Sequence, residues 1–182
     1  MKKVKKFGDK KLTIRFSEKA DIKKAARFKR YTDELAEDDT AYISRKQKIS
    51  LKEKRKYIKD RLERIKKHKL VILIAEDKDK VVGMTIISLR SYVQSHIGGL
   101  GIHILKDYRG IGLGKYFMKE ILKLAKTKLK PKPQMIRLSV FSVNKTAISL
   151  YKKIGFRSVA KIPKQFKLKG KLYDEVVMLK YL

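Results

Sequence analysis

Three glycines stand within five residues of one another, at Gly110, Gly112 and Gly114, in the stretch "DYRGIGLGKYFM" (107–118). Glycine accepts the positive φ angles that other residues avoid, and its missing side chain lets another group approach the main chain closely. Apolar residues at helical spacing follow directly. The stretch therefore predicts a turn of bare main chain that connects a strand to the start of an amphipathic helix.

At the start of that helix, the main-chain N–H groups of residues 110–115 would point toward one spot, with the positive end of the helix dipole behind them. This arrangement suits a pyrophosphate, and Lys115 would add positive charge at its rim. Two common phosphate loops are excluded. A Walker A loop needs glycine at Arg109 and serine or threonine at Tyr116, and a Rossmann loop needs glycine at Lys115. The alternative is a tight turn without a ligand, which would need only one glycine.

The rest of the chain alternates between strand and helix patterns. A turn is expected around Gly98 and Gly99. Apolar and alternating stretches predict strands at 12–16, 70–76, 81–89, 100–105, 135–141, 157–162 and 173–179, the second and third of them forming a hairpin. Together with the helices, these strands predict one compact α/β or α+β domain.

Four helices are predicted from apolar spacing and from their end signals. The first follows Ser17 and runs to about residue 28, and the second follows a capping box of Ser50 and Glu53 and runs to about residue 67. The third begins at the glycine segment and ends before residue 131. The fourth is capped by Asn144 and stopped by Gly155.

Length and composition indicate a single folded domain over residues 1–182, with residues 1–11 as a loose basic tail. The chain has no cysteine, which excludes disulfides and thiolate metal sites, and we predict no metal site. No apolar run is long enough to cross a membrane, and the basic start lacks the apolar segment of a secretory signal. We therefore expect a soluble, cytoplasmic protein.

The charge is strongly positive, with 49 basic against 18 acidic residues and a formal net charge of +31. Such a surface attracts polyanions, so non-specific binding of nucleic acid is one expectation. The other is that the lysines lie on solvated faces and serve no particular partner. The lysines occur throughout the chain rather than in one tail or helix, which favours the second interpretation.

Two motifs resemble those of a known family. Residues 109–114 fit the pattern R/Q-x-x-G-x-G/A, and "LSVFSVNKTAISLYKKIGF" (138–156) fits a strand followed by N-x-x-A-x-x-L-Y-x-x-x-G-F. These resemble two signature motifs of the GNAT superfamily of acetyl-CoA-dependent N-acyltransferases, and the order of elements from about Leu12 onward is similar too. The resemblance implies an α/β (α+β) fold whose central mixed, mostly antiparallel sheet is flanked by helices and splays open at the acetyl-CoA site, between 100–105 and 135–141.

The resemblance further implies that acetyl-CoA is a cosubstrate and that a primary amine attacks it directly in a ternary complex. Tyr151 would be the general acid for the departing thiolate, although its spacing also fits an ordinary core aromatic residue. The implied cofactor-binding residues are Ile102, His103 and Ile104 for the pantetheine arm, Arg109, Gly110, Ile111, Gly112, Leu113, Gly114 and Lys115 for the pyrophosphate, and Asn144 and Tyr151.

The general base and the acceptor stay open at this point. Some family members that act on ribosomal proteins carry a glutamate on the second-motif strand, where this chain has Ser139. His103 could titrate near neutral pH, and Glu76 could act through water or cap a hairpin. The acceptor could be a small amine or a protein or peptide amine.

An acidic stretch between the first two predicted helices could recognise a cationic amine, although a solvated helix face is the favoured interpretation. Its residues are Asp33, Glu34, Glu37, Asp38 and Asp39. The exposed closing strands permit a homodimer. The competing function is a basic RNA- or ribosome-associated binding module that uses the same fold without catalysis.

Overall fold

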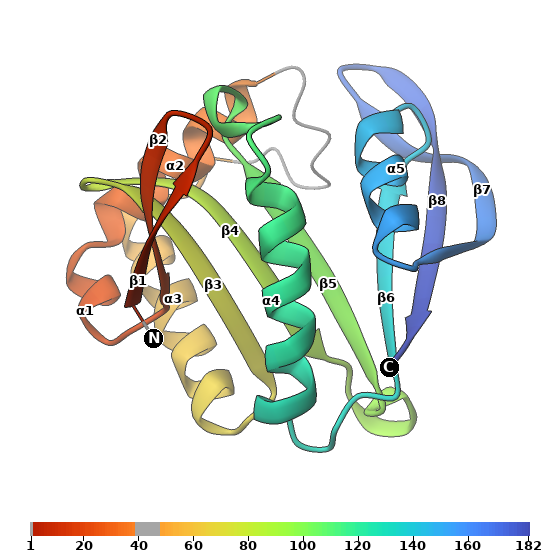
Figure 1. Ribbon diagram of the computed structural model, residues 1–182, viewed down its shortest axis with the longest axis horizontal. Coiled ribbons are helices and arrows are strands. Elements are labelled where there is room, and N and C mark those ends of the chain that lie inside the picture. The colour runs from red at the N-terminus through yellow and green to blue at the C-terminus, as the bar shows by residue number, and fades with distance from the viewer. Residues whose placement is uncertain (1, 39–47) are drawn as a thin grey trace.

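The computed structural model describes residues 2–38 and 48–182. In this part of the chain eight strands form one sheet (Figure 1), namely β1 (Lys2–Phe7), β2 (Lys10–Phe16), β3 (Leu70–Asp77), β4 (Lys80–Leu89), β5 (Ile97–Ile104), β6 (Met135–Phe141), β7 (Arg157–Leu168) and β8 (Lys171–Tyr181). The helices are α1 (Ala20–Lys23), α2 (Ala25–Glu37), α3 (Leu51–Lys66), α4 (Leu113–Lys128) and α5 (Lys145–Lys153).

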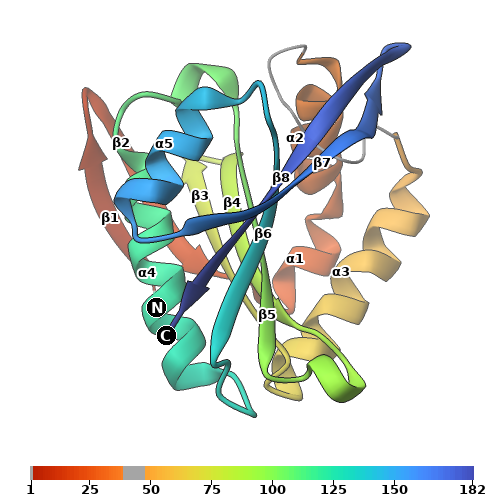
Figure 2. The same cartoon turned by 90° about the vertical axis from the view of Figure 1, so that its right-hand side faces the viewer.

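The sheet is mixed and mostly antiparallel, in the order β1-β2-β3-β4-β5-β6-β8-β7. Among the described strands, β5 and β6 form the one parallel pair, and they pair only where Ile97–Gly99 lies beside Met135–Arg137. Beyond that point the two strands diverge (Figure 1). α1, α2 and α3 cover one face of the sheet, and α4 and α5 lie on the other (Figure 2). The structure thus confirms a single α/β domain with a splayed sheet.

α4 lies against the centre of the sheet and supplies much of the core. Its buried residues recur at helical spacing, as the sequence predicts, and are Leu113, Phe117, Met118, Ile121, Leu122 and Ala125. Most of these side chains are completely buried, which is worth roughly 1.5–3 kcal/mol for each large apolar residue. α4 is therefore fixed along its whole length, and so is the glycine segment at its start.

The expectation of a loose basic tail over residues 1–11 is wrong for the described residues. Lys2–Phe7 forms β1, which pairs with β2 in antiparallel register from Lys2↔Arg15 to Phe7↔Lys10. Phe7 is buried and makes an edge-to-face contact with Tyr116 of α4, with ring centroids 5.4 Å apart. Main-chain pairing and one buried ring therefore hold a segment that otherwise consists mainly of lysine.

The expected turn at Gly98 and Gly99 is also wrong, because both residues lie inside β5. A Cβ atom at Gly98 would lie 2.7 Å from Ile136 Cδ1 and 2.8 Å from Ile87 Cγ2, which is closer than carbon atoms can pack. Glycine is needed here because the neighbouring strands press on β5 where it joins β6. The turn before β5 contains a short 3₁₀ helix, Tyr92–Gln94, instead.

This crowding gives a stability prediction. Gly98→Ala is expected to lower the free energy of unfolding by roughly 1–3 kcal/mol, because an added methyl group in a packed core forces its neighbours apart. Gly99→Ala is the matched control, since its Cβ would meet only Ser88 O, at an ordinary 3.7 Å. Urea unfolding of the two variants tests this. Equal losses of stability would mean that crowding at Gly98 is not the cause.

Several other element boundaries differ from the sequence prediction. Ser17 does not cap a helix; its hydroxyl donates to Asp21 within α1. A separate helix, α2, continues to Glu37, so the acidic stretch begins on a helix, and its last residue, Asp39, lies outside the described residues. The capping box of Ser50 and Glu53 is confirmed. β7 and β8 are longer than predicted because they pair with each other almost to the turn between them.

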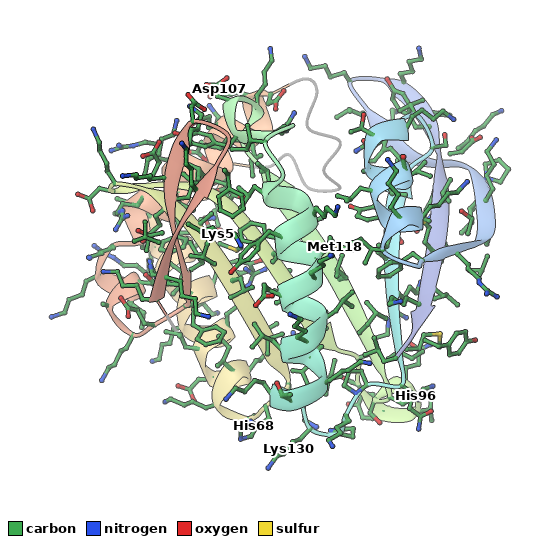
Figure 3. All side chains as sticks on the ribbon, in the orientation of Figure 1. Lys5, His68, His96, Asp107, Met118 and Lys130 are labelled. Carbon is green, nitrogen blue, oxygen red and sulfur yellow. The ribbon has the colours of Figure 1, made fainter. Side chains whose placement is uncertain are left out.

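Basic side chains project around the whole outline of the domain in the view of Figure 3. Both edge strands are rich in lysine: β1 has the sequence KKVKKF, and β7 carries Lys161, Lys164 and Lys167. Lysines on an open edge discourage the addition of a strand from another molecule, because pairing would bring like charges together. Part of the positive charge therefore has a structural use. Among the described helices, none combines the length and the apolar character that a membrane span requires.

Candidate functional site

A cleft with a volume of about 1170 Å³ opens where β5 and β6 diverge. Three parts of the chain line it: the end of β5, the glycine segment that leads into α4, and one side of α5. Leu35 of α2 reaches it from the opposite face of the sheet, so the cleft connects the two faces. The two motifs found in the sequence therefore lie on facing walls of one cavity.

The glycine segment forms the wall at the start of α4. Gly110 and Gly112 have φ angles of 77° and 90°, and Gly112 is the N-terminal cap of the helix. A Cβ atom at either position would meet nothing within 4 Å, so bare main chain faces open space. The first N–H groups of a helix have no partner within it, and the helix dipole makes this end positive. The segment thus fits a pyrophosphate.

Gly114 has a different reason to be glycine. Its Cβ would lie 3.3 Å from Leu150 Cδ2 of α5 and 3.6 Å from Ile104 Cδ1 of β5. The missing side chain lets the start of α4 approach α5 and β5, which form the other walls of the cleft. A larger residue would push the second motif away from the first.

The other residues predicted in this segment divide into two groups. Lys115 is exposed and lines the cleft at its rim. Arg109 also lines it, but its Nε donates to Ile104 O at 2.8 Å and its Nη2 pairs with Asp38 at 2.5 Å, so its side chain ties the segment to β5 and α2. The side chains of Ile111 and Leu113 pack against the core, so each can present only its main chain.

The end of β5 offers free main chain to the cleft. Ile102, His103 and Ile104 pair with β4 on one side, but β6 has already diverged on the other. All three residues line the cleft. An extended amide-containing chain could therefore hydrogen-bond along this edge of β5, as a pantetheine arm would require.

The second motif supplies Asn144 and Tyr151. Asn144 Oδ1 accepts a hydrogen bond from Ala147 N at 3.2 Å, which confirms the predicted helix cap. Tyr151 is 7% exposed and lies on the wall of the cleft. Burial raises the pKa of Tyr151 to about 12, so its hydroxyl keeps its proton at neutral pH. Within the described part of the chain, no group hydrogen-bonds to this hydroxyl.

His103 faces the other mouth of the cleft. Its carbonyl oxygen accepts a hydrogen bond from the buried Tyr31 hydroxyl at 2.8 Å. Burial, reinforced by the positive charge of Arg61, lowers the pKa of His103 to about 4. The imidazole is therefore neutral at physiological pH. The sequence prediction did not include Tyr31, because a tyrosine inside an acidic helical stretch gives no signal for such a contact.

The shifted His103 gives a pH-dependent stability prediction. Because the folded-state pKa lies below the unfolded value of about 6.5, the unfolded chain binds the proton more readily. Stability is therefore complete above about pH 6.5 and is lost as the pH falls toward 4, by at most roughly 3 kcal/mol. His103→Asn should remove this part of the pH dependence in urea unfolding, and the exposed His68→Asn should keep it. An unchanged slope in His103→Asn would contradict the assignment.

Glu76 lies away from the cleft, in a buried cluster of charges. Its carboxylate accepts hydrogen bonds from Arg15 at 2.7 and 2.8 Å and from Arg27 at 3.0 Å, and Arg15 also pairs with Asp21. Although burial opposes the charge of Arg15, these carboxylates raise its pKa. The cluster fastens α1 and α2 to the sheet. Neither Glu76 nor Ser139 is among the residues that line the cleft.

The described part of the acidic stretch carries lysine partners. Asp33 pairs with Lys29 at 2.5 Å, Glu34 with Lys80 at 2.9 Å and Glu37 with Lys48 at 2.6 Å. Asp38 holds Arg109, and Asp39 lies outside the described residues. These pairs favour a solvated helix face over a site for a cationic amine.

Comparison with known proteins finds the same fold. The sequence matches the model of the acetyltransferase (GNAT) family over residues 30–156. No curated protein matches it significantly.

Similar solved structures include an acetyltransferase of the GNAT family from Streptococcus pneumoniae (24% identity, 94% of this chain and 99% of that one, TM-score 0.80). Another is a putative acetyltransferase from Salmonella typhimurium, solved with its cofactor acetyl-CoA (20%, 94% and 94%, 0.78). A third is a ribosomal-protein-S5-alanine acetyltransferase from Vibrio fischeri (12%, 100% and 96%, 0.82).

Proposed function

The chain belongs to the acetyltransferase (GNAT) family, whose members use acetyl-CoA, and from this premise we propose that it transfers the acetyl group to a primary amine in a ternary complex. The observation that carries the proposal is the cleft between β5 and β6, which has a positive helix start on one side and reaches the other face of the sheet. Donor and acceptor can therefore meet inside the sheet from opposite faces.

The residues of the cleft divide into those for the nucleotide end and those for the arm. The N–H groups of residues 110–115 would hold the pyrophosphate, and Lys115 would add charge at the rim. The main chain of residues 102–104 would bind the pantetheine arm as an added strand does. Asn144 and Tyr151 would contact the cofactor from α5. Open space at Gly110 and Gly112 supports this assignment.

Acetyl-CoA supplies a thioester, whose C–S bond breaks as the acceptor nitrogen bonds to the carbonyl carbon. The protein's own part is to position, exclude water and manage charge. A main-chain N–H of β5 would donate to the carbonyl oxygen, where negative charge develops. The Tyr151 hydroxyl would donate to the departing sulfur. The acceptor must arrive as a neutral amine, and the proton it then loses would pass to water, directly or by way of His103.

The solved neighbours leave the acceptor open between two classes. They include a ribosomal-protein-alanine N-acetyltransferase from Brucella melitensis and a putative phosphinothricin N-acetyltransferase, at 20% and 22% identity. Both proteins align over more than nine tenths of this chain. We therefore propose a primary amine of either a small molecule or a protein N-terminus as the acceptor class.

An acyl-transfer screen tests the proposal. The protein is incubated with acetyl-CoA and with amines, polyamines, amino acids and N-terminal peptides, and the released thiol is measured. We expect thiol release that depends on the acceptor. If calorimetry detects no binding of acetyl-CoA and no acceptor releases thiol, the proposed function is wrong.

A filter-binding titration with RNA examines the alternative of a basic binding module. Weak binding that falls steeply with salt is expected from the net charge of +31 alone, whatever the sequence of the RNA. Tight, sequence-dependent binding would favour the module instead.

A further inference from the structure

The two faces of β5 have separate uses if the proposed function holds, and the following inference rests on it. The side chain of Ile104 lies on the face of the sheet that α4 covers. Its Cγ1 is 3.5 Å from the Cβ position of Gly83, which Phe117 and Leu113 of α4 also approach. Side chains alternate along a strand, so His103 lies on the opposite face, toward α2 and α3. Figure 2 shows these helices across the sheet from α4. A nucleotide held at α4 leaves the His103 face to the acceptor.

Arg61 of α3 lies on this acceptor face. Its guanidinium stacks on the Tyr57 ring at 4.1 Å, and Nη1 donates to Met84 Sδ at 3.4 Å. Met84 is the cross-strand partner of His103, and His103 lines the cleft. The guanidinium therefore lies beside the mouth of the cleft, and its charge contributes to the lowered pKa of His103.

Arg61, like the half-buried Arg90 and Arg137, differs from the arginines of the fold that carboxylates of the described residues hold. Arg15, Arg27 and Arg109 each pair with a carboxylate. Arg61 is half-buried, yet no carboxylate in residues 2–38 and 48–182 pairs with it. The groups that act on its charge are Tyr57, which also hydrogen-bonds to it, Arg64 and Tyr31. Burial lowers its pKa, and the nearby Arg64 adds repulsion. A partly desolvated charge without a counter-ion is costly, so binding an anion here would be favourable.

The form of the group indicates the anion. A guanidinium is a planar fork of donors that matches the two oxygens of a carboxylate. One face of Arg61 is occupied by Tyr57 and one donor by Met84, which leaves an edge of the fork for a single planar group. Tyr57 itself is 42% exposed, so this site opens to solvent.

We propose that Arg61 binds a carboxylate of the acceptor, and that the acceptor is an amine carrying such a group rather than a polyamine. Binding the carboxylate at Arg61 would direct the amine past His103 toward the cleft. Two sources share this chemistry: a free amino acid, and a peptide whose first residues include an acidic side chain. Arg61 is thus a specificity-determining residue.

The test compares matched acceptors and matched variants. Amino acids are paired with their amides, and acidic N-terminal peptides with their glutamine or asparagine counterparts. In the parent protein, kcat/KM should be higher for the acceptor with the carboxylate than for its uncharged amide counterpart, in the pair that the enzyme uses. Arg61→Gln should raise KM for that acceptor by roughly 10- to 100-fold, with a small change in kcat and in the Kd of acetyl-CoA. Arg64→Gln, on the same helix, should match the parent protein.

A second variant and a second readout keep the outcome decisive. Arg61→Lys keeps the charge but loses the fork, and its KM should fall between those of the parent and Arg61→Gln. Two results would overturn the role of Arg61 and leave the proposed function standing. One is equal kcat/KM in the parent protein for the carboxylate and its amide. The other is an equal loss of kcat/KM for both acceptors in Arg61→Gln. If no amine releases thiol, amino acids are titrated into the protein with CoA by calorimetry. Binding that Arg61→Gln weakens supports the site, and absent or unchanged binding overturns it.

Discussion

Gly112→Glu is expected to lower the affinity for acetyl-CoA by roughly 100-fold or more, because a like charge brought against a bound group costs several kcal/mol and each 1.4 kcal/mol is tenfold. Gly112 caps α4 with a φ of 90°, and a side chain there would project into open space at the helix start. The new carboxylate would occupy the place proposed for the pyrophosphate. Calorimetry with acetyl-CoA measures the loss.

The chain offers a matched control for this substitution. Gly170, in the turn between β7 and β8, has a φ of 77° and nothing within 4 Å of its Cβ position. Gly170→Glu therefore introduces a similar backbone strain and the same charge at a distance from the cleft. It should bind acetyl-CoA like the parent protein. If both variants bind equally well, or lose affinity equally, the glycine segment does not hold the pyrophosphate.

Tyr151→Phe is expected to lower kcat by roughly 100-fold, comparable to the loss of one donor to a developing negative charge. With its pKa raised to about 12, the hydroxyl holds its proton more tightly than a thiol with a pKa of about 8.5 does. It should therefore stabilise the departing sulfur mainly as a hydrogen-bond donor, with no full proton transfer needed. The Kd of acetyl-CoA should change little, because the ring that lines the cleft is kept.

Tyr116→Phe is the control for removing a phenol hydroxyl. Tyr116 is a half-buried residue of α4 that packs on Phe7, outside the cleft. Single-turnover kinetics with an acceptor from the screen separate the chemical step from cofactor binding. A Tyr151→Phe variant with the turnover of the parent would show that the hydroxyl has no part in the reaction and that Tyr151 is an ordinary core aromatic residue.

The elements that bear the motifs could be predicted from the sequence because local chemistry decides them. β6 has the predicted bounds, Asn144 caps α5, and Gly155 ends it with a φ of 94°. Apolar spacing placed α4 correctly. In each case the signal is a residue type that only one local conformation favours, such as a side-chain cap or a positive φ.

β1 and the start of β5 could not be predicted, because distant contacts decide them. β1 has the exposed, lysine-rich pattern of a tail, and only its pairing with β2 and the burial of Phe7 make it a strand. Gly98 belongs to a strand because it pairs with Leu89 of β4 and with Ile136 of β6, 38 positions further on. A glycine that makes room and a glycine that turns the chain look the same in a sequence.

The roles of two charged residues, Glu76 and Arg61, could not be predicted for a similar reason. Glu76 is the last residue of the predicted strand 70–76 and was a candidate base, yet Arg15 and Arg27 from other elements hold it. Arg61 is one of many basic residues along α3 and has no distinguishing neighbour in the sequence. What sets it apart is its half-buried place beside the cleft with no carboxylate of residues 2–38 and 48–182 paired with it, and this is a property of the folded chain.

Because β5 and β6 pair over only a short stretch, the sheet has two parts, one of β1 to β5 and one of β6, β8 and β7. The glycine segment and the edge of β5 lie on the first part, and α5 lies on the second. A ligand that spans the gap contacts both parts of the sheet and restricts their motion relative to each other. When the ligand is bound, amide hydrogen exchange should therefore slow in β6 and β8 as well as in β5. Binding at the glycine segment would in this way stabilise strands on the other side of the cleft.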